Sequence, residues 1–272
     1  MDVVSLGYQT DLAIRRTEGS QITDCGDHIV VRTERNPGYW WGNFILLAEP
    51  PRAGEADRWL ARFAALFPAA RHRTFGVDVT DAAAVGEAGF AAAGFRAERN
   101  VVLTASSVIQ PRQPSLAVRV RPLATGDDWR QSAALRLACF EPDAAAGPAA
   151  GPDVSADEQE FDARKLAVRR QLTETGRAAW FGAFAAGRLV AQLGLVPAGH
   201  GLARYQDVET HPEFRRQGLA GLLVWRAGTY GLTDLGAVRL VIVADPGYHA
   251  FRLYQSLGFG RAEDQVGFEQ TP

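Results

Sequence analysis

The sequence predicts a mixed α/β fold of the α+β kind, in which helices flank a central mixed sheet. In the second half, strand-like runs and helical runs follow one another in a regular series. Hydrophobic residues make up 47% and charged residues 22% of the 272 residues, as in ordinary folded proteins. The two halves also resemble each other at a spacing of 164 residues (245 minus 81). Length and repeat together predict two tandem copies of one fold.

The second half gives the clearest series of elements. Residues 116–122 alternate apolar and polar side chains, which is typical of a strand, and 126–140 have apolar residues at helical spacing. The series continues with a helix at 156–176, strands at 178–184, 188–196 and 202–210, a helix at 216–232, a strand at 238–244, a helix at 248–257 and a strand at 265–270. Between the first two helices, 141–155 is rich in Ala, Gly and Pro, so it is either a flexible insertion or a loop over a site.

The first half is a shorter version of the later part of this series. Its predicted elements are strands at 28–32 and 41–48, a helix at 55–66, a strand at 74–79, a helix at 82–93 and a strand at 99–104. Asp81, Phe90, Gly94 and Phe95 precede Asp245, Tyr254, Gly258 and Phe259 by the same 164 residues. The alternative is chance similarity of two strand-helix-strand units. We predict a decayed copy at 1–110, a linker at 111–115 and an intact domain at 116–272.

Charge and composition argue against several classes of function. The formal net charge of −2 lacks the basic excess typical of nucleic-acid partners. The longest apolar runs fall short of the roughly 18 residues that a membrane helix needs. We see no secretory signal in residues 1–20, and Cys25 and Cys139 are too few for a disulfide framework, so we expect a cytoplasmic protein. The histidines have no metal-ligand spacing, so we expect no metal. The oligomeric state is left open.

The segment 205–223 carries the chemistry. A predicted strand leads through His211 and Pro212 into a turn that runs directly into a helix. The first turn of a helix has unpaired N–H groups and the positive end of the dipole, which suits a diphosphate. Gly218 lets the backbone approach a phosphate closely, and Arg215 and Arg216 add positive charge. The alternative is an ordinary connection with a solvated arginine pair.

Two motifs resemble the hallmarks of the GNAT N-acetyltransferase superfamily. Arg215-Arg216-Gln217-Gly218-Leu219-Ala220 fits its (Gln/Arg)-x-x-Gly-x-(Gly/Ala) signature, and Ala250-Phe-Arg-Leu-Tyr-Gln-Ser-Leu-Gly-Phe259 resembles its second hallmark. The resemblance covers 116–270 well and the first half only as a weak copy. It implies a GNAT-like fold that binds acetyl-CoA as acyl donor. Because the first half does not match the diphosphate motif, we expect one cofactor site per chain.

The resemblance also implies roles for individual residues. Backbone groups of Val208, Glu209 and Thr210 would pair with the pantetheine arm, as an added strand does. The residues implied to bind the rest of the cofactor, chiefly through backbone amides that hold the diphosphate, are Arg215, Arg216, Gln217, Gly218, Leu219, Ala220 and Gly221. Tyr254 would lie near the thioester sulfur. A phenol, with a pKa of about 10, can protonate a leaving thiolate whose pKa is about 8.5.

The sequence departs from the family pattern at two positions. Arg204 stands where many members have a glutamate as general base, and arginine accepts no proton. The base must therefore come from elsewhere, act through water or not be needed. Asp207, Glu209 and His211 are the nearby candidates for a catalytic base, and we rank Glu209 above Asp207. Gly247 stands where the family often has an asparagine that contacts CoA.

These features predict an acetyl-CoA-dependent N-acetyltransferase. The acceptor would be a primary amine of a small molecule or peptide, and attack would be direct within a ternary complex, because neither cysteine lies in the motifs. Catalysis by Cys139 is the less favoured reading, and a buried structural thiol the preferred one. The alternatives are a transferase of a larger acyl group and a non-catalytic acyl-CoA-binding sensor or docking module.

The first copy lacks this chemistry. Phe90 occupies the tyrosine position, and Glu55 stands where a phosphate would lie. Tyr39, Trp40 and Trp41 form an aromatic concentration next to a Pro-Gly turn. They either pack against the other domain or line the acceptor pocket.

Overall fold

The computed structural model describes residues 1–52, 54–86, 88–140 and 156–270, and its chain divides into two compact units. Unit 1 comprises Met1–Thr104, Val241–Phe251 and Gly260–Pro272, and unit 2 comprises Ala105–Leu240 and Arg252–Phe259. The predicted insertion or loop at 141–155 lies outside the described residues. The predicted boundaries separate two copies of one fold along the chain, whereas the two units are groups of residues in contact in space. The boundaries therefore stay a prediction.

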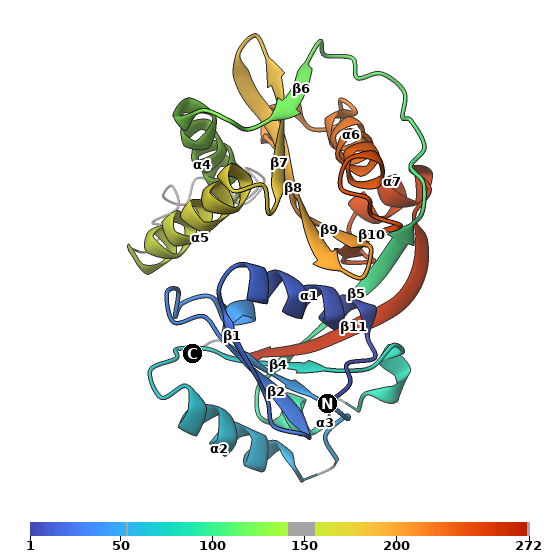
Figure 1. Ribbon diagram of the computed structural model, residues 1–272. Helices are drawn as coiled ribbons and strands as arrows, with labels where there is room; N and C mark the ends of the chain where they lie inside the picture. The colour runs from blue at the N-terminus through green and yellow to red at the C-terminus, as the bar shows by residue number, and fades with distance from the viewer. Residues whose placement is uncertain (53, 87, 141–155, 271–272) are drawn as a thin grey trace, which may run out of the picture. The chain divides into compact units, whose positions relative to one another are not determined.

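Unit 1 is a sheet with helices on both faces (Figure 1). Its elements are α1 (Leu6–Thr17), β1 (Gln21–Asp24), β2 (His28–Arg32), the 3-10 helix η1 (Trp40–Gly42), β3 (Phe44–Leu47), α2 (Ala56–Leu66), β4 (Arg73–Val77), η2 (Ala82–Ala84), α3 (Ala88–Ala92), β5 (Arg96–Ala105) and β11 (Gly260–Gln270). The strand order is β1-β2-β3-β4-β11-β5. β3 and β4 pair in parallel, whereas β11 is antiparallel to both of its neighbours. The last strand of the chain therefore completes the sheet of unit 1.

The core of unit 1 has two parts because its central strands are buried on both faces. β3 reads Phe-Ile-Leu-Leu, and all four residues are buried, as expected for a strand covered on both sides. One cluster joins the strands to α2 and α3 through Trp59, Phe63, Phe75, Phe90 and Phe268. The other cluster joins them to α1 through Tyr8, Leu12, Val31, Phe44 and Leu46. Alternate side chains of the same strands thus serve opposite layers.

Unit 2 is also a sheet covered by helices on both faces. Its elements are β6 (Arg119–Pro122), α4 (Gly126–Phe140), α5 (Ala156–Glu174), β7 (Ala179–Ala185), β8 (Arg188–Gly199), β9 (Leu202–Thr210), η4 (Pro212–Phe214), α6 (Leu219–Thr233), and parts of β10 (Arg239–Ala244) and α7 (Ala250–Ser256). The strand order is β10-β9-β8-β7-β6. Figure 1 shows α4 and α5 on one face of β7 and β8 and α6 on the other. The predicted mixed α/β class is confirmed.

Two expectations for the elements of unit 1 were wrong in detail, and two elements were missed. The strand expected at 41–48 is η1 followed by β3, because the Asn43 side chain donates to the Tyr39 carbonyl over 2.9 Å and closes a turn. The helix expected at 82–93 is divided into η2 and α3, and Asp81 caps η2 by accepting from the Ala83 N–H over 2.9 Å. α1 and β1 were not predicted. The signal for α1 is Ser5, whose side chain caps the helix.

The helix ends that define the repeat have the same local geometry. The Phe95 N–H donates to the Phe90 carbonyl over 2.9 Å, and the Phe259 N–H donates to the Tyr254 carbonyl over 3.2 Å. Each bond spans a glycine with positive φ, 82° at Gly94 and 99° at Gly258. This is the Schellman arrangement that ends a helix. The matching caps support the tandem-copy interpretation.

Among the described residues, no helix combines the length and apolarity needed to cross a membrane.

Candidate functional site

The turn between β9 and α6 has an unusual backbone. His211 caps η4 by accepting from the Glu213 N–H over 3.3 Å. Arg216 and Gly218 then adopt positive φ values of 62° and 84°. Glycine takes such angles without cost, whereas an arginine at positive φ is uncommon. The expected helix at 216–232 therefore starts three residues later, at Leu219, because these two residues are not helical.

This turn leads into the start of α6, where the first N–H groups have no partner within the helix. The Leu222 N–H donates to the Gly218 carbonyl over 3.1 Å and begins the helical bonds. The N–H groups of Leu219, Ala220 and Gly221 come before it, so the helix itself offers them no carbonyl partner. Gly218 supplies no side-chain cap. The geometry fits the predicted diphosphate site, whose occupancy stays a prediction.

β9 contains a bulge just before this turn. Gln192 and Gly194 of β8 pair with Glu209 and Gln206, so two residues of β9 face one residue of β8. Asp207 in the bulge has a φ of 48°. A bulge bends its strand and re-aims side chains. The predicted pairing of the backbone at 208–210 with pantetheine stays a prediction.

Glu209 lies in a hydrogen-bonded network on the α4 side of β9. Arg136 Nη1 donates to its Oε1 over 2.8 Å, and Gln192 Nε2 donates to its Oε2 over 2.6 Å. Ser132 Oγ donates to the Gln192 Oε1 over 2.6 Å, which fixes the amide in turn. Both carboxylate oxygens therefore have a donor from unit 2.

Asp207 extends the network toward α5. Its carboxylate accepts a hydrogen bond from Arg169 and lies 3.6 Å from Arg136 Nη1 and 3.7 Å from Lys165 Nζ. Arg136 Nε also donates to Asp162 Oδ1 over 2.7 Å. The six side chains of this charged cluster are Arg136, Asp162, Lys165, Arg169, Asp207 and Glu209. Three positive and three negative charges balance in it.

Burial raises the pKa of the Glu209 carboxyl above its ordinary value. The nearby Asp207 charge acts in the same direction, whereas Arg136 acts against it. A raised pKa makes the ionised carboxylate a stronger base. Glu209 was the first-ranked candidate for the base from the sequence, but its partners Arg136 and Gln192 were not predicted. A buried arginine on a helix has no distinctive spacing in a sequence.

Tyr254 lies in the interior of unit 2 with 6% of its surface exposed. Its ring contacts Phe259 edge-on, with centroids 6.4 Å apart. A second phenol is its neighbour: burial raises the pKa of Tyr205, and Tyr254 contributes to the same shift. The Tyr205 hydroxyl donates to the Val224 carbonyl over 2.8 Å, so Tyr205 anchors β9 to α6. Tyr205 is thus bonded to α6, and the role of Tyr254 as proton donor stays a prediction.

Cys139 lies in the last turn of α4, next to Thr210 of the predicted site. Its sulfur lies 3.5 Å from the Thr210 carbonyl, to which it donates. Burial raises the pKa of the thiol, which works against formation of a thiolate. These features fit the preferred reading of Cys139 as a structural thiol.

The aromatic residues before β3 pack inside unit 1. Trp40 stacks on His72 with ring centroids 5.6 Å apart. Trp41 donates a hydrogen bond to Glu269 of β11 and contacts Phe44. Arg15 lies 4.7 Å above the Tyr39 ring. These contacts stabilise unit 1 itself, which neither of the two sequence-based interpretations considered.

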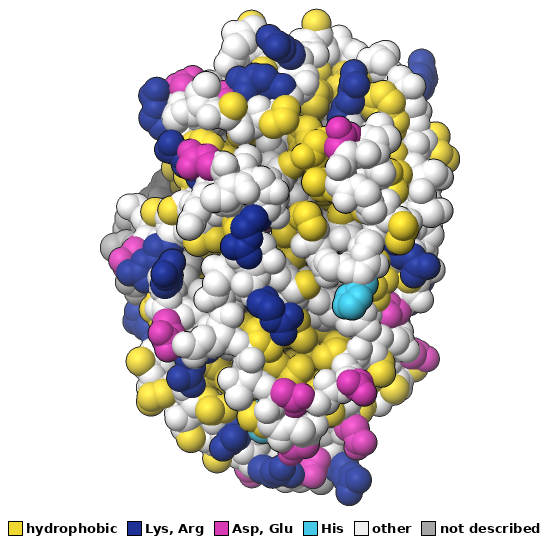
Figure 2. Space-filling model, in the orientation of Figure 1, with side chains coloured by type: hydrophobic (Ala, Val, Ile, Leu, Met, Phe, Trp, Pro, Cys, Tyr) yellow, Lys and Arg dark blue, Asp and Glu magenta, His cyan; other side chains and the backbone are white. Residues whose placement is uncertain are grey.

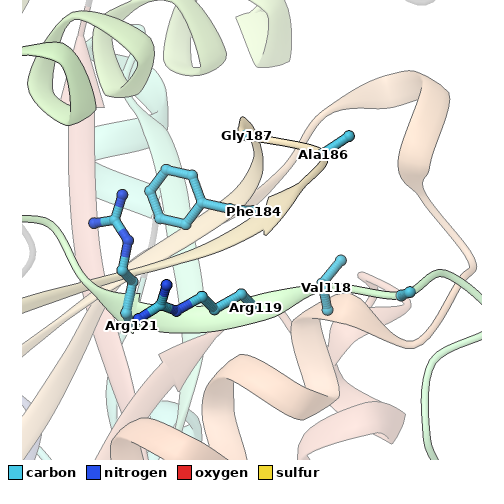
Figure 3. A pocket seen from close by; sticks show the side chains of 7 residues that line it. Val118, Arg119, Arg121, Phe184, Ala186 and Gly187 are labelled. Atoms are coloured by element: carbon cyan, nitrogen blue, oxygen red, sulfur yellow. The ribbon is translucent and has the colours of Figure 1, made fainter.

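A separate hollow of about 500 Å³ lies at the edge strand β6 (Figure 3). It is lined by Ala117, Val118, Arg119, Arg121, Phe184, Ala186 and Gly187. The Arg121 guanidinium lies 3.9 Å above the Phe184 ring and donates twice to Asp128 over 2.7 Å. These contacts give Arg121 a structural role, and the hollow shares no residue with the turn before α6.

The surface and the titratable groups add two observations. Basic and acidic side chains are interspersed over the face in Figure 2, in line with the nearly balanced charge. The His, Cys, Asp and Glu side chains in the described part of the chain form no group of three able to hold a metal ion.

Comparison with known proteins shows a similarity over the segment that holds this site. The profile of the acetyltransferase (GNAT) family matches residues 144–259. This segment is therefore similar to the GNAT acetyltransferase family. The matched GNAT segment contains β9, the turn, the start of α6 and Tyr254. Members of this family bind acetyl-CoA or CoA, and the match supports acyl-CoA-dependent acetyl transfer as the class of activity.

Solved structures support the GNAT fold over nearly the whole chain. A functionally unknown conserved protein from Staphylococcus epidermidis is 11% identical, with a TM-score of 0.65 and coverage of 93% of this chain and 94% of its own. A GCN5-related N-acetyltransferase from Kribbella flavida is 16% identical, with a TM-score of 0.59 and coverage of 98% and 96%. A tandem GNAT protein from the clavulanic acid biosynthesis pathway is 15% identical, with a TM-score of 0.53 and coverage of 93% and 83%. No curated protein matches the chain.

Proposed function

We propose that this protein is an acetyl-CoA-dependent N-acetyltransferase that acts on a primary amine of a small molecule or peptide. The observation that carries the proposal is the start of α6 after the turn at Arg216 and Gly218, inside the segment that the family profile matches. Residues 215–221 would hold the diphosphate, and the β9 backbone at 208–210 would pair with the pantetheine arm. Acetyl-CoA is the acyl donor, and we assign no metal.

The proposed reaction is direct attack in a ternary complex. The amine nitrogen attacks the acetyl carbon, the carbon–sulfur bond breaks, and an amide and a thiolate form. The Tyr254 phenol gives its proton to the thiolate, and the proton lost by the nitrogen goes to the Glu209 carboxylate. The raised pKa of Glu209 favours this role. A carboxylate has about four lone-pair positions, so its bonds to Arg136 and Gln192 leave further acceptor capacity.

The test is thiol release from acetyl-CoA over a panel of amines, with the Tyr254→Phe variant in parallel. The variant loses one oxygen and should fold normally, and turnover should fall by roughly 10² to 10⁴. Release with longer acyl-CoA donors separates acetyl transfer from transfer of a larger group. Binding of acetyl-CoA without turnover of any amine would indicate a sensor or docking module. Unchanged turnover by Tyr254→Phe, with chemistry rate-limiting, would remove Tyr254 from the mechanism.

A further inference from the structure

Gln192 is a polar residue in the middle of an apolar strand. The central part of β8, at 189–196, reads Leu-Val-Ala-Gln-Leu-Gly-Leu-Val, and all of these residues are buried. Only 1% of the surface of Gln192 is exposed. Burial of an amide costs free energy unless its polar atoms are hydrogen-bonded, so an apolar side chain would be the ordinary choice at this position. An amide here therefore needs partners within the fold.

The partners of Gln192 fix the direction in which its amide faces. Glu209 is its cross-strand neighbour on β9, so the two side chains lie on the same face of the sheet. Gln192 Nε2 donates to Glu209 Oε2 over 2.6 Å and to the Ser132 backbone carbonyl over 3.3 Å. The Ser132 hydroxyl donates to Gln192 Oε1 over 2.6 Å. Rotation of the amide would turn its oxygen toward two acceptors, so the observed orientation is the one that satisfies these bonds.

The amide acts on the Glu209 carboxylate together with Arg136. Arg136 holds one carboxylate oxygen and Gln192 holds the other, so the carboxylate is fixed from two sides. Within the described part of the chain, the charged and titratable groups that act on Glu209 or face it are Arg136 and Cys139 of α4, Arg169 of α5 and Asp207 of β9. Burial is the largest effect and raises the pKa of Glu209, whereas the hydrogen bond from Gln192 lowers it. The bond therefore favours the ionised carboxylate, which is the form that accepts a proton.

We propose that Gln192, fixed by Ser132, is a positioning residue for Glu209: it holds the carboxylate in one orientation and keeps it ionised at neutral pH. This inference rests on the proposed function, in which Glu209 accepts the proton of the amine. In this role Gln192 acts through Glu209 and not on the reacting atoms. A purely structural network would instead hold α4 against β8 and leave proton transfer unaffected.

The test compares Gln192→Met with Gln131→Met in the full chain. Methionine has nearly the length of glutamine but no donor, so Gln192→Met leaves Glu209 Oε2 without this bond. Gln131 lies next to Ser132 on α4 and accepts from the Leu189 N–H over 2.8 Å, so the control also removes a bond between α4 and β8. The first measurement is the pH dependence of kcat with an amine from the panel. The second is the titration of Glu209 by carbon-13 NMR of glutamate-labelled chain, with Glu209→Gln to assign the signal.

The two curves should move together. In Gln192→Met, Glu209 should titrate at higher pH, because a hydrogen bond to the charged form favours that form. The acidic limb of the kcat profile should move in the same direction, with kcat reduced about fivefold at pH 6 and less at pH 8 and with the KM for acetyl-CoA unchanged. Gln131→Met should leave both curves in place. If Gln192→Met does not fold, Ser132→Ala removes a single oxygen and should move both curves in the same direction by a smaller amount.

The outcomes separate this inference from the proposed function. A loss of stability with both curves in place overturns the role of Gln192 and leaves the acetyltransferase standing. An NMR curve that moves while the kcat profile stays in place also overturns it, because Glu209 then accepts no proton in the reaction. Failure of the unmodified chain to release thiol with any amine overturns the proposed function itself, and with it this role.

Discussion

The charged cluster of unit 2 should depend on Arg136 far more than on Glu209. Arg136 is bonded to Glu209 and Asp162 and lies 3.6 Å from Asp207, with only 10% of its side chain exposed. Arg136→Met leaves buried carboxylates without their main cation, and breaking a buried pair in this way costs about 3–5 kcal/mol. Glu209→Gln still leaves Arg136 with two carboxylates. It also removes a charge that burial disfavours, so it should cost less than about 1.5 kcal/mol, the value of one charged hydrogen bond.

The assay is urea unfolding at pH 7 of the two single variants and the double variant, followed by circular dichroism. The double variant should be more stable than Arg136→Met, because it removes the carboxylate that the first change leaves unpaired. The reasoning is refuted if the two single variants lose equal stability, or if their costs simply add. If Arg136→Met alone does not fold, the stability of the double variant can still be measured and compared with that of Glu209→Gln.

The pH dependence has a definite sign. The pKa of Glu209 is raised by folding, so its favourable contribution is full below the unfolded value of about 4.3 and is lost as pH rises through the folded pKa. Arg136→Met should raise that pKa further. The stability difference between this variant and the unmodified chain should therefore shrink as pH falls from 7 toward 5. A constant difference would contradict the assignment.

Three other predictions follow from the site and the packing. Arg216→Glu should weaken acetyl-CoA binding, with one site per chain in titration of the unmodified protein, because it places a negative charge beside the diphosphate; two equivalent sites would exclude the single-site proposal. Trp41→Ala should lower the free energy of unfolding by at most about 3 kcal/mol, since Trp41 packs inside unit 1. The KM for each substrate should stay unchanged, and an altered KM for the acceptor would restore the predicted role of Trp41 in the acceptor pocket. Gly94→Ala and Gly258→Ala should each cost about 1–2 kcal/mol in thermal unfolding, because both glycines have positive φ; a cost at only one position would weaken the repeat interpretation.

The sequence by itself determined the features that depend on neighbours along the chain. The strand at 202–210 was predicted at the bounds that β9 has, and α4 at 126–140 likewise. The glycines that end α3 and α7 were visible as a repeat, since a Schellman cap is built from about six consecutive residues. Apolar period and turn residues are local signals, and they carried the mixed α/β class and the family resemblance.

The tertiary structure decided everything that depends on distant partners. Glu209 acquires Arg136, which is 73 residues away, and Trp41 acquires Glu269, which is 228 residues away. β11 lies between β4 and β5, although the chain reaches it last. No pattern within one segment records which other segment will cover it, because burial and ion pairing are set by the closed fold. Tyr254 and the turn before α6 could therefore be found from local motifs, whereas the network around Glu209 could not.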